Sequence, residues 1–235
     1  MINTAIILAG GMGTRLKSVV SEVPKPMAPI NGIPFLEIQI KYWIRQGINN
    51  FILSVGYKKE IIINHFGFKF HTAEIKYVLE DSPLGTGGAI LKSIKEFDIK
   101  EPFMLLNGDT YFEISLINLL SFHQNNGSQF TFSVFKSNNS ERYMGLNLDH
   151  NMRLFPEIYI ENSNDEKYVN GGVYIINPEI LNREKFENDK FYSLENDIFP
   201  IINKKESLIY ACLFDNKFID IGVPEDYYLA QKILP

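Results

Sequence analysis

The stretch Thr4-Ala-Ile-Ile-Leu-Ala-Gly-Gly-Met-Gly-Thr-Arg-Leu16 places a glycine-rich loop directly after a short, continuous apolar run. An apolar run of this kind, without polar alternation, is typical of a strand that is covered on both faces. Glycines after such a strand let backbone N–H groups approach a phosphate closely, because no Cβ atom stands in the way. The stretch therefore predicts a buried strand of a parallel sheet, followed by an anion-binding loop.

Apolar runs alternate with amphipathic segments through the first half of the chain. From Pro34 to Ile48 apolar residues recur at helical spacing, and a second strand follows at Phe51 to Val55. The same order continues with a helix over about 59–66, a strand at 75–79, a helix over about 87–97 and a strand at 103–106. This alternation predicts an α/β fold, in which ligands collect outside the carboxyl ends of the strands.

Shorter strand-like runs replace this alternation after about residue 130. They cover residues 130–135, 146–148, 168–176 and 208–214, with further helices expected near 193–202 and from Pro224. A chain of 235 residues fits one domain, so we expect a single domain over residues 1–235.

The composition excludes several classes of protein. Hydrophobic residues make up 45% of the chain, which excludes wholesale disorder. The net charge of −5 argues against sequence-independent binding to nucleic acid or to an anionic membrane, so a local site must hold any phosphate ligand. The single cysteine, Cys212, cannot form an internal disulfide, and the sequence has no basic leader and no long apolar span. We therefore expect a soluble, cytoplasmic protein.

Two cations accompany the glycine loop: Arg15 lies within it, and Lys25 follows in Val23-Pro-Lys-Pro-Met27. A tight strand-to-helix turn would explain the glycines, but it would not explain why two cations lie in the same loop. The dinucleotide-binding fingerprint fails because Leu16 stands where its third glycine should be, and the Gly-Lys-Ser/Thr of the Walker motif is absent from the sequence.

Two aspartates follow apolar strand candidates and are separated by more than one hundred residues. Asp109 follows the strand at 103–106, and Asp220 follows the pair Phe218-Ile219. Either aspartate alone is explained as well by a turn or a helix cap. Together at strand ends they would suit Mg²⁺, which takes oxygen ligands and is usually held by one or two carboxylates plus phosphates.

The signature Gly-Gly-x-Gly-Thr-Arg-Leu with a downstream Pro-Lys-Pro resembles the sugar-1-phosphate nucleotidyltransferases. The resemblance continues in family order over essentially the whole chain through these motifs: Pro83-Leu-Gly-Thr-Gly-Gly-Ala89, Leu106-Asn-Gly-Asp-Thr110, Asn170-Gly-Gly-Val-Tyr174 and Asp220-Ile-Gly-Val-Pro-Glu-Asp226. Within this family the chain is most similar to the D-glycero-D-manno-heptose 1-phosphate guanylyltransferases. It implies a Rossmann-like three-layer sandwich with a mixed, mostly parallel sheet, the glycosyltransferase-A-like nucleotidyltransferase fold. Residues of about 1–130 would bind the nucleotide and those of about 131–235 the sugar phosphate.

The resemblance also implies roles for individual residues. Arg15 would bind the triphosphate and the departing pyrophosphate, Lys25 the α-phosphate, and Asp109 with Asp220 a magnesium ion. Nucleotide contacts are implied for Leu8, Ala9, Gly10, Gly11, Gly13, Thr14, Glu80, Pro83, Gly85, Thr86 and Gly87. Sugar-phosphate contacts are implied for Asn107, Gly108, Asn170, Gly171 and Glu195.

Glu80 stands where the family carries its base-reading side chain. A carboxylate only accepts hydrogen bonds, and the pairing edge of guanine offers two adjacent donors, so Glu80 favours GTP over UTP. A glutamate also occurs in similar loops of uridylyltransferases, and Glu80 could instead pair with a neighbouring cation.

The sugar side departs from the family at one point. Many relatives carry Glu-Lys shortly before the Asn-Gly-Gly strand, whereas this chain reads Phe155-Pro-Glu-Ile-Tyr159. We hypothesise that Lys167 replaces the missing lysine. The Asn170-Gly171 pair is also explained by a β-bulge, and Glu195 by the dipole of a helix that begins at Ser193.

The expected reaction joins a sugar 1-phosphate, namely D-glycero-α-D-manno-heptose 1-phosphate for a surface polysaccharide, to the α-phosphorus of GTP and releases pyrophosphate. Three alternatives remain: mannose 1-phosphate guanylyltransfer, uridylyl or cytidylyl transfer to another sugar 1-phosphate, and a non-catalytic subunit that senses nucleotide sugars. The expected partners are the small-molecule substrates, and a homodimer contact at Tyr227-Tyr228 stays open.

Overall fold

A mixed sheet forms the centre of the molecule in the computed structural model, which describes residues 2–137, 145–146, 148–154, 167–204 and 208–235. Eight of its nine strands follow the order β12-β9-β11-β7-β1-β4-β6-β5, and β10 pairs with β11. The strands are β1 (Thr4–Leu8), β4 (Asn50–Val55), β5 (Lys69–Phe70), β6 (Ala73–Leu79), β7 (Phe103–Asn107), β9 (Phe130–Ser137), β10 (Gly145–Leu146), β11 (Lys167–Ile176) and β12 (Ile209–Leu213).

The four strands β7, β1, β4 and β6 are parallel, and they end at the same edge of the sheet. Leu8 at the end of β1 pairs with Asn107 on β7 and with Ser54 on β4. β11 runs antiparallel to β7 and to β9, so the sheet is mixed around a parallel centre. The loops that follow β1, β4, β6 and β7 therefore meet at one edge, as expected for ligand sites in α/β sheets.

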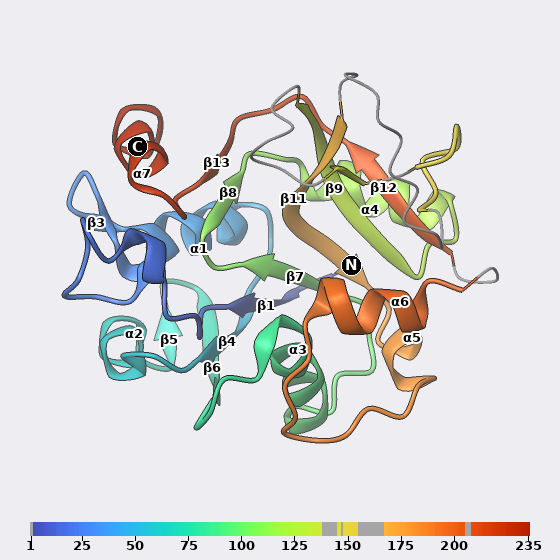
Figure 1. The fold of residues 1–235 in the computed structure, drawn as a ribbon, viewed down its shortest axis with the longest axis horizontal. Helices are drawn as coiled ribbons and strands as arrows, with labels where there is room; N and C mark the ends of the chain where they lie inside the picture. Colours follow the sequence, from blue (N-terminus) through green and yellow to red (C-terminus); the bar gives the residue numbers. More distant parts are fainter. Residues whose placement is uncertain (1, 138–144, 147, 155–166, 205–207) are drawn as a thin grey trace.

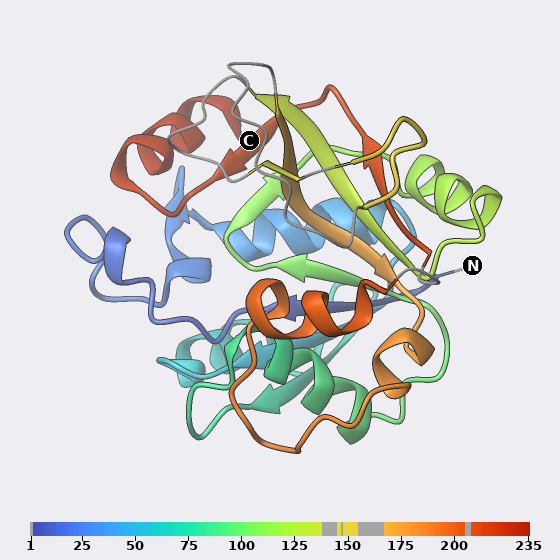
Figure 2. The same ribbon diagram turned by 45° about the vertical axis from the view of Figure 1, so that its right-hand side comes forward.

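Helices cover both faces of the sheet and complete the predicted three layers (Figures 1 and 2). α1 (Phe35–Arg45), α2 (Lys59–Phe66) and α4 (Leu116–Asn125) pack on one face, where Trp43 is buried. α3 (Gly85–Glu96), α5 (Glu179–Asn182), α6 (Phe199–Ile202) and the π-helix Leu194–Ile198 pack on the other. The apolar strand residues thus divide between two core layers, which is why these strands show no polar alternation.

A second, smaller structure lies beyond the carboxyl edge of the sheet. It contains the antiparallel pair β8 (Thr110–Phe112) and β13 (Phe218–Asp220), the hairpin β2 (Pro29–Ile30) and β3 (Ile33–Pro34), the 3₁₀ turns Thr14–Leu16 and Lys25–Met27, and α7 (Pro224–Ile233). Figure 1 shows β8 and β13 side by side between α7 and the main sheet. These elements share their own apolar core around Phe35, Ile219 and Tyr227.

The structure adds elements that the sequence pattern did not predict. α4 was missed, although Ser115 caps it by accepting a hydrogen bond from the N–H of Asn118 at 3.3 Å. The four-residue α5 and the short strands β2, β3, β5 and β8 were missed as well. The helix expected over about 193–202 is split into a π-helical turn followed by α6.

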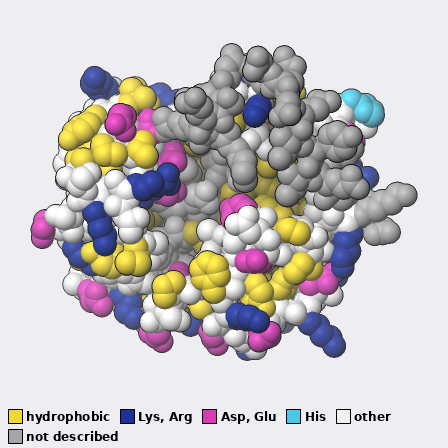
Figure 3. Space-filling model, in the orientation of Figure 1, with side chains coloured by type: hydrophobic (Ala, Val, Ile, Leu, Met, Phe, Trp, Pro, Cys, Tyr) yellow, Lys and Arg dark blue, Asp and Glu magenta, His cyan; other side chains and the backbone are white. Residues whose placement is uncertain are grey.

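The surface bears on the expected partners. On the face that Figure 3 shows, the lysine and arginine side chains of the described residues are mixed with aspartate and glutamate rather than gathered in one broad patch. Within the described part of the chain, no helix is long and apolar enough to cross a membrane.

The two tyrosines at the predicted dimer contact differ in exposure. Tyr227 is buried, and its hydroxyl donates to the carbonyl of Pro29 over 2.7 Å, whereas Tyr228 is 55% exposed. The homodimer stays a prediction.

Candidate active site

The glycine loop that follows β1 is shaped by the side chain of Lys25. Gly13 has a left-handed backbone (φ 57°), and a Cβ atom at this position would lie 2.7 Å from the Cβ of Lys25. An L side chain is strained in this conformation and would also collide with the lysine. The loop therefore needs glycine at position 13 so that Lys25 can pass across it.

The Lys25 ammonium lies between the two predicted metal-binding aspartates. Its Nζ atom is 2.5 Å from Asp109 Oδ2 and 3.7 Å from Asp220 Oδ1. The lysine side chain is only 10% exposed, so this ion pair is screened much less than one at the surface. The structure thus brings together three charged residues that the sequence separates widely.

The β8–β13 pair brings the two aspartates together. Asp220, the last residue of β13, is paired with Thr110 on β8, the residue after Asp109. The N–H of Ile221 donates to the carbonyl oxygen of Asp109 at 3.0 Å, and the N–H of Gly222 donates to Asp220 Oδ1 at 2.7 Å. These bonds hold the backbones of the two aspartates next to each other, and the N–H of Gly222 also orients the Asp220 carboxylate.

The environment of Asp220 disfavours the ionised form of its carboxyl. Burial raises the pKa of the Asp220 carboxyl above its ordinary value, and the charge of the neighbouring Asp109 raises it further. Lys25, the N–H of Gly222 and Arg15 oppose this shift without cancelling it. A further cation would relieve the repulsion between the two carboxylates.

A cavity of about 230 Å³ opens beside this cluster. Eight of the predicted site residues line it, together with Pro26 and Gly222, which the prediction left out: Leu8, Gly11, Gly13, Thr14, Arg15, Lys25, Gly108 and Asp109. Gly222 could have been found from the sequence because it lies in the quoted motif that begins at Asp220. The cavity combines backbone N–H groups of a glycine loop with two cations, which suits a polyphosphate.

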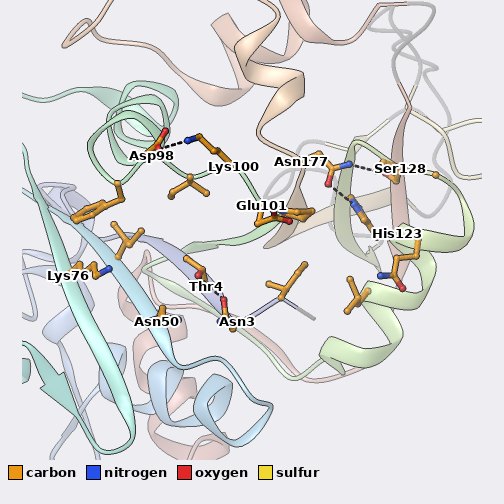
Figure 4. Close-up of a pocket in the computed structure, with 18 residues that line it drawn as sticks. Asn3, Thr4, Asn50, Lys76, Asp98, Lys100, Glu101, His123, Ser128 and Asn177 are labelled. Atoms are coloured by element: carbon orange, nitrogen blue, oxygen red, sulfur yellow. Dashed lines mark hydrogen bonds and ion pairs between the residues drawn. The ribbon is translucent and has the colours of Figure 1, made fainter.

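A larger cavity of about 920 Å³ lies at the opposite end of the strands (Figure 4). None of the predicted site residues lines it. Several of its polar side chains are paired with one another, as in the Asp98–Lys100 ion pair at 2.6 Å and the contact between His123 Nε2 and Asn177 Oδ1 at 3.3 Å. The smaller cavity is therefore the better candidate for the active site.

Glu80 lies beside the glycine loop, after the end of β6. Its carboxylate accepts hydrogen bonds from the Ser54 hydroxyl at 2.8 Å and from the N–H of Leu84 at 3.3 Å. A Cβ atom on Gly10 would lie 2.3 Å from Glu80 Oε1, so the carboxylate touches the loop backbone. Among the residues that the structure describes, Glu80 is held by these two hydrogen bonds and not by a cation. Its base-reading role stays a prediction.

The second glycine-rich loop contacts the segment that carries Glu195. The Thr86 hydroxyl accepts from the N–H of Leu194 at 2.8 Å and donates to Glu195 Oε2 at 3.2 Å. The N–H of Gly87 donates to the carbonyl of Tyr192 at 2.8 Å. The bond between Thr86 and Glu195 connects a predicted nucleotide-binding residue with a predicted sugar-binding residue. Gly85 begins α3 here, and Pro83 is exposed in the loop before it.

The predicted sugar residues of β11 lie next to the end of β7. The register of β11 shifts against β9 between Asn170 and Tyr174, so the bulge that glycines predicted is present. The Asn170 amide donates to the Tyr174 hydroxyl at 2.8 Å, and a Cβ atom on Gly172 would lie 2.9 Å from Asn107 Nδ2. Gly171 packs against Phe112. The Tyr174 hydroxyl also hydrogen-bonds with the side chain of Asn107, so Asn107 and Asn170 belong to one polar cluster.

Lys167 begins β11, and its side chain packs beside Gly145 of β10. The segment 155–159, in which relatives carry the missing lysine, lies outside the described residues. The replacement of that lysine by Lys167 stays a prediction.

The residues at the cleft fit a divalent metal ion. Asp109 and Asp220 offer carboxylate oxygens on either side of the Lys25 ammonium. Burial, and after it the charge of Asp109, raises the pKa of the Asp220 carboxyl, so a bound cation would stabilise its ionised form. Among the described residues no group of three or more His, Cys, Asp or Glu side chains could hold a metal ion. Mg²⁺ needs fewer protein ligands, because phosphates and water complete its coordination.

Comparisons with known proteins show the family to which the chain belongs. The family model described as "Nucleotidyl transferase" matches residues 4–235, and the chain belongs to this family of transferase enzymes. D-glycero-alpha-D-manno-heptose 1-phosphate guanylyltransferases of Campylobacter jejuni subsp. jejuni serotype O:2 and Aneurinibacillus thermoaerophilus are each 42% identical to it. The alignments cover 95% and 98% of this chain and 96% and 97% of the relatives. The crystal structure of HddC from Yersinia pseudotuberculosis complexed with GMP-PN superposes with a TM-score of 0.82 at 35% identity, covering 98% of this chain and 99% of HddC.

Proposed function

We propose that this chain transfers a guanylyl group from GTP to D-glycero-α-D-manno-heptose 1-phosphate and releases pyrophosphate. The observation that carries the proposal is the convergence of Lys25, Asp109 and Asp220 beside the glycine-loop cavity. The names of the two relatives at 42% identity support the sugar and the base. The complex of HddC with GMP-PN supports a guanine nucleotide.

The reaction needs positioning more than it needs covalent chemistry. An oxygen of the sugar phosphate attacks the α-phosphorus of GTP, and the bond between the α-phosphorus and the bridging oxygen to the β-phosphate breaks. Because the second pKa of a phosphate is about 6, the attacking oxygen is already ionised near neutral pH, so no general base is required. The barrier comes mainly from repulsion between anions and from their alignment.

The cations of the cleft oppose this repulsion. Lys25 would offer its ammonium to the α-phosphate, and the exposed guanidinium of Arg15 would bind the triphosphate and the departing pyrophosphate. Asp109 and Asp220 would hold a magnesium ion, which neutralises phosphate charge when bound. Residues 1–130 would thus provide the nucleotide side, and residues 131–235 the sugar side through Asn170 and Glu195.

A grid of substrates tests this function. Pyrophosphate release is measured with GTP, ATP, UTP and CTP against heptose, mannose and glucose 1-phosphates. We expect the highest kcat/KM with GTP and the heptose 1-phosphate, and no release when the sugar phosphate is left out. A higher kcat/KM with mannose 1-phosphate or with UTP would show that the proposed sugar or the proposed nucleotide is wrong. No release with any pair would favour a non-catalytic sensor.

A further inference from the structure

Two polar side chains of helix α1, and a third directly after the helix, contact the segment 107–116, which begins at the end of β7. Gln39, Tyr42 and Gln46 occur at intervals of three and four residues, which places them on one side of the helix. The Tyr42 hydroxyl and the Gln46 amide both donate to the carbonyl of Ile114, at 2.8 and 3.1 Å. Gln46 Oε1 also accepts from the N–H of Leu116 at 2.7 Å. These two side chains hold the far end of the segment.

Gln39 contacts the near end of the same segment, at the turn that carries Asp109. Its Nε2 atom donates to the carbonyl of Asn107 at 2.9 Å and to the carbonyl of Thr110 at 2.8 Å. The first carbonyl precedes Asp109 in the chain and the second follows it, so the amide of Gln39 links the two ends of the turn. Gln39 is 1% exposed, and water cannot replace these bonds easily.

The orientation of this amide is determined by its surroundings. Both hydrogen atoms of Nε2 are used, while Oε1 finds no hydrogen-bond partner among the described residues. A buried acceptor without a partner costs stability. An apolar side chain would fill the same space without that cost, so the amide at position 39 is explained by its two donated bonds.

The same helix is tied to the segment that carries Lys25. The N–H of Phe35, at the start of α1, donates to the carbonyl of Ala28 at 3.0 Å, directly after the turn Lys25–Met27. Figure 1 shows α1 behind β8. One rigid element therefore contacts the backbone on both sides of the Lys25–Asp109 ion pair.

We propose that Gln39 is a positioning residue, which holds the Asn107–Thr110 turn so that the Asp109 carboxylate faces Lys25 and Asp220. The proposal rests on the proposed function, because it assumes that Asp109 helps to bind the metal and the phosphates. A displacement of about 1 Å in a reacting group can cost about 100-fold in rate. Gln39 is not among the residues that line the 230 Å³ cavity, and it acts through the turn.

Two matched variants test the proposal. Gln39→Leu removes an amide within α1 and Gln46→Leu an amide directly after it, and each of these amides bonds to the backbone of residues 107–116. Both variants should lower the Tm. Only Gln39→Leu should raise the Mg²⁺ concentration for half-maximal pyrophosphate release, by about tenfold or more, as changes behind metal ligands commonly do. It should also lower kcat more than it raises the KM for GTP.

The opposite results overturn the proposal. It fails if Gln39→Leu leaves the Mg²⁺ dependence as in the wild type, or if Gln46→Leu shifts it equally. Gln39→Glu is the second variant in case Gln39→Leu does not fold, because it keeps the side-chain volume and loses both donors when ionised. Even when its carboxyl is protonated, this variant has one donor instead of two, so it should also raise the Mg²⁺ concentration for half-maximal pyrophosphate release. An unchanged Mg²⁺ dependence in Gln39→Glu counts against the proposal.

A binding measurement separates this proposal from the proposed function. Mn²⁺ binding to the wild type, Gln39→Leu and Gln46→Leu is followed by electron paramagnetic resonance in the presence of pyrophosphate. We expect weaker binding only in Gln39→Leu, by about tenfold. If the wild type released no pyrophosphate with any substrate pair, the function would fall, and this measurement would still decide whether Gln39 positions Asp109.

Discussion

The N–H of Ile221 donates a hydrogen bond to the carbonyl oxygen of Asp109 at 3.0 Å. Through this bond and the pairing of Asp220 with Thr110, two carboxylates from distant parts of the chain lie on either side of the Lys25 ammonium. The geometry makes Lys25 a counter-ion for the aspartates, and its predicted role is to offer the same ammonium to the α-phosphate.

Lys25→Ala should therefore lower kcat much more than it weakens GTP binding. Loss of a hydrogen-bond donor that stabilises the transition state raises the activation free energy by about 2 kcal/mol or more. The effect is large because charge develops on the phosphate in the transition state. Pyrophosphate release and GTP binding are measured separately. Lys100→Ala, which removes only the exposed pair with Asp98, is the control and should retain kcat. An unchanged kcat in Lys25→Ala would remove Lys25 from the mechanism.

The same substitution should change the response to metal. Without the ammonium, Asp109 and Asp220 repel each other, so Mg²⁺ should raise the Tm of Lys25→Ala more than that of the wild type. Equal Mg²⁺-induced shifts of the Tm in both proteins would contradict a metal site between the two aspartates.

Gly13→Ala should inactivate the enzyme through Lys25. The new Cβ atom would lie 2.7 Å from the Cβ of Lys25 and would displace the lysine, in addition to the backbone strain at φ 57°. Gly127→Ala is a matched control, since Gly127 has a similar φ of 56° and no atom within 4 Å of the added Cβ. Both variants should lose about 1–2 kcal/mol of unfolding free energy from strain. Only Gly13→Ala should have a lower kcat. Equal kcat values in the two variants would show that the added Cβ atom does not displace Lys25.

Glu80→Gln should reduce the preference for GTP over UTP. The carboxylate offers only acceptors to the base, whereas the amide adds a donor that suits uracil better than guanine. The ratio of kcat/KM for the two nucleotides is the measurement. Asp81→Asn makes the same change one residue further along, on a carboxylate that is 3.5 Å from Lys59 and 90% exposed, and it should leave the ratio as it is. An unaltered ratio in Glu80→Gln would show that Glu80 does not select the base.

His123 should make the protein less stable in mild acid. Burial lowers the pKa of His123 below its ordinary value of 6.5, against the opposing hydrogen bond with Asn177. Protonation therefore favours the unfolded chain, so this contribution to stability is complete above about pH 6.5 and is lost as the pH falls below it. The slope is at most about 1.36 kcal/mol per pH unit.

Urea unfolding of the wild type, His123→Gln and His150→Gln between pH 5 and 8 measures this effect. The exposed His150 is the control, and its substitution should leave the slope as in the wild type. His123→Gln should flatten the slope below the ordinary pKa of 6.5. A constant difference between wild type and His123→Gln over this range would contradict the prediction.

The elements with strong periodicity were predictable from the sequence. The helix expected over about 59–66 is α2 (Lys59–Phe66), and the apolar runs of the first half are β1, β4, β6 and β7. Their common edge could be predicted too, because parallel strands end on the same side. The glycine loop, Lys25 and Asp109 were therefore expected near one another, and the structure brings them together.

The contacts that complete the site could not be predicted in this way. β8 and β13 have three residues each, which is too short for a periodic signal. Their pairing and the hydrogen bond from Ile221 to Asp109 bring the two aspartates together. Gln39 lies on an amphipathic helix, where a single polar residue gives no sign that it bonds to a turn. Both features depend on long-range packing.

The position of Asp220 so late in the chain also has a kinetic consequence. The parallel centre and Trp43, the sole tryptophan, come from the first half of the chain, and Trp43 is buried against that centre. The cleft forms only when Asp109 and Asp220, which are far apart in the chain, come together. Contacts between such distant residues form slowly. During refolding, the fluorescence of Trp43 should therefore reach its native value before enzymatic turnover returns.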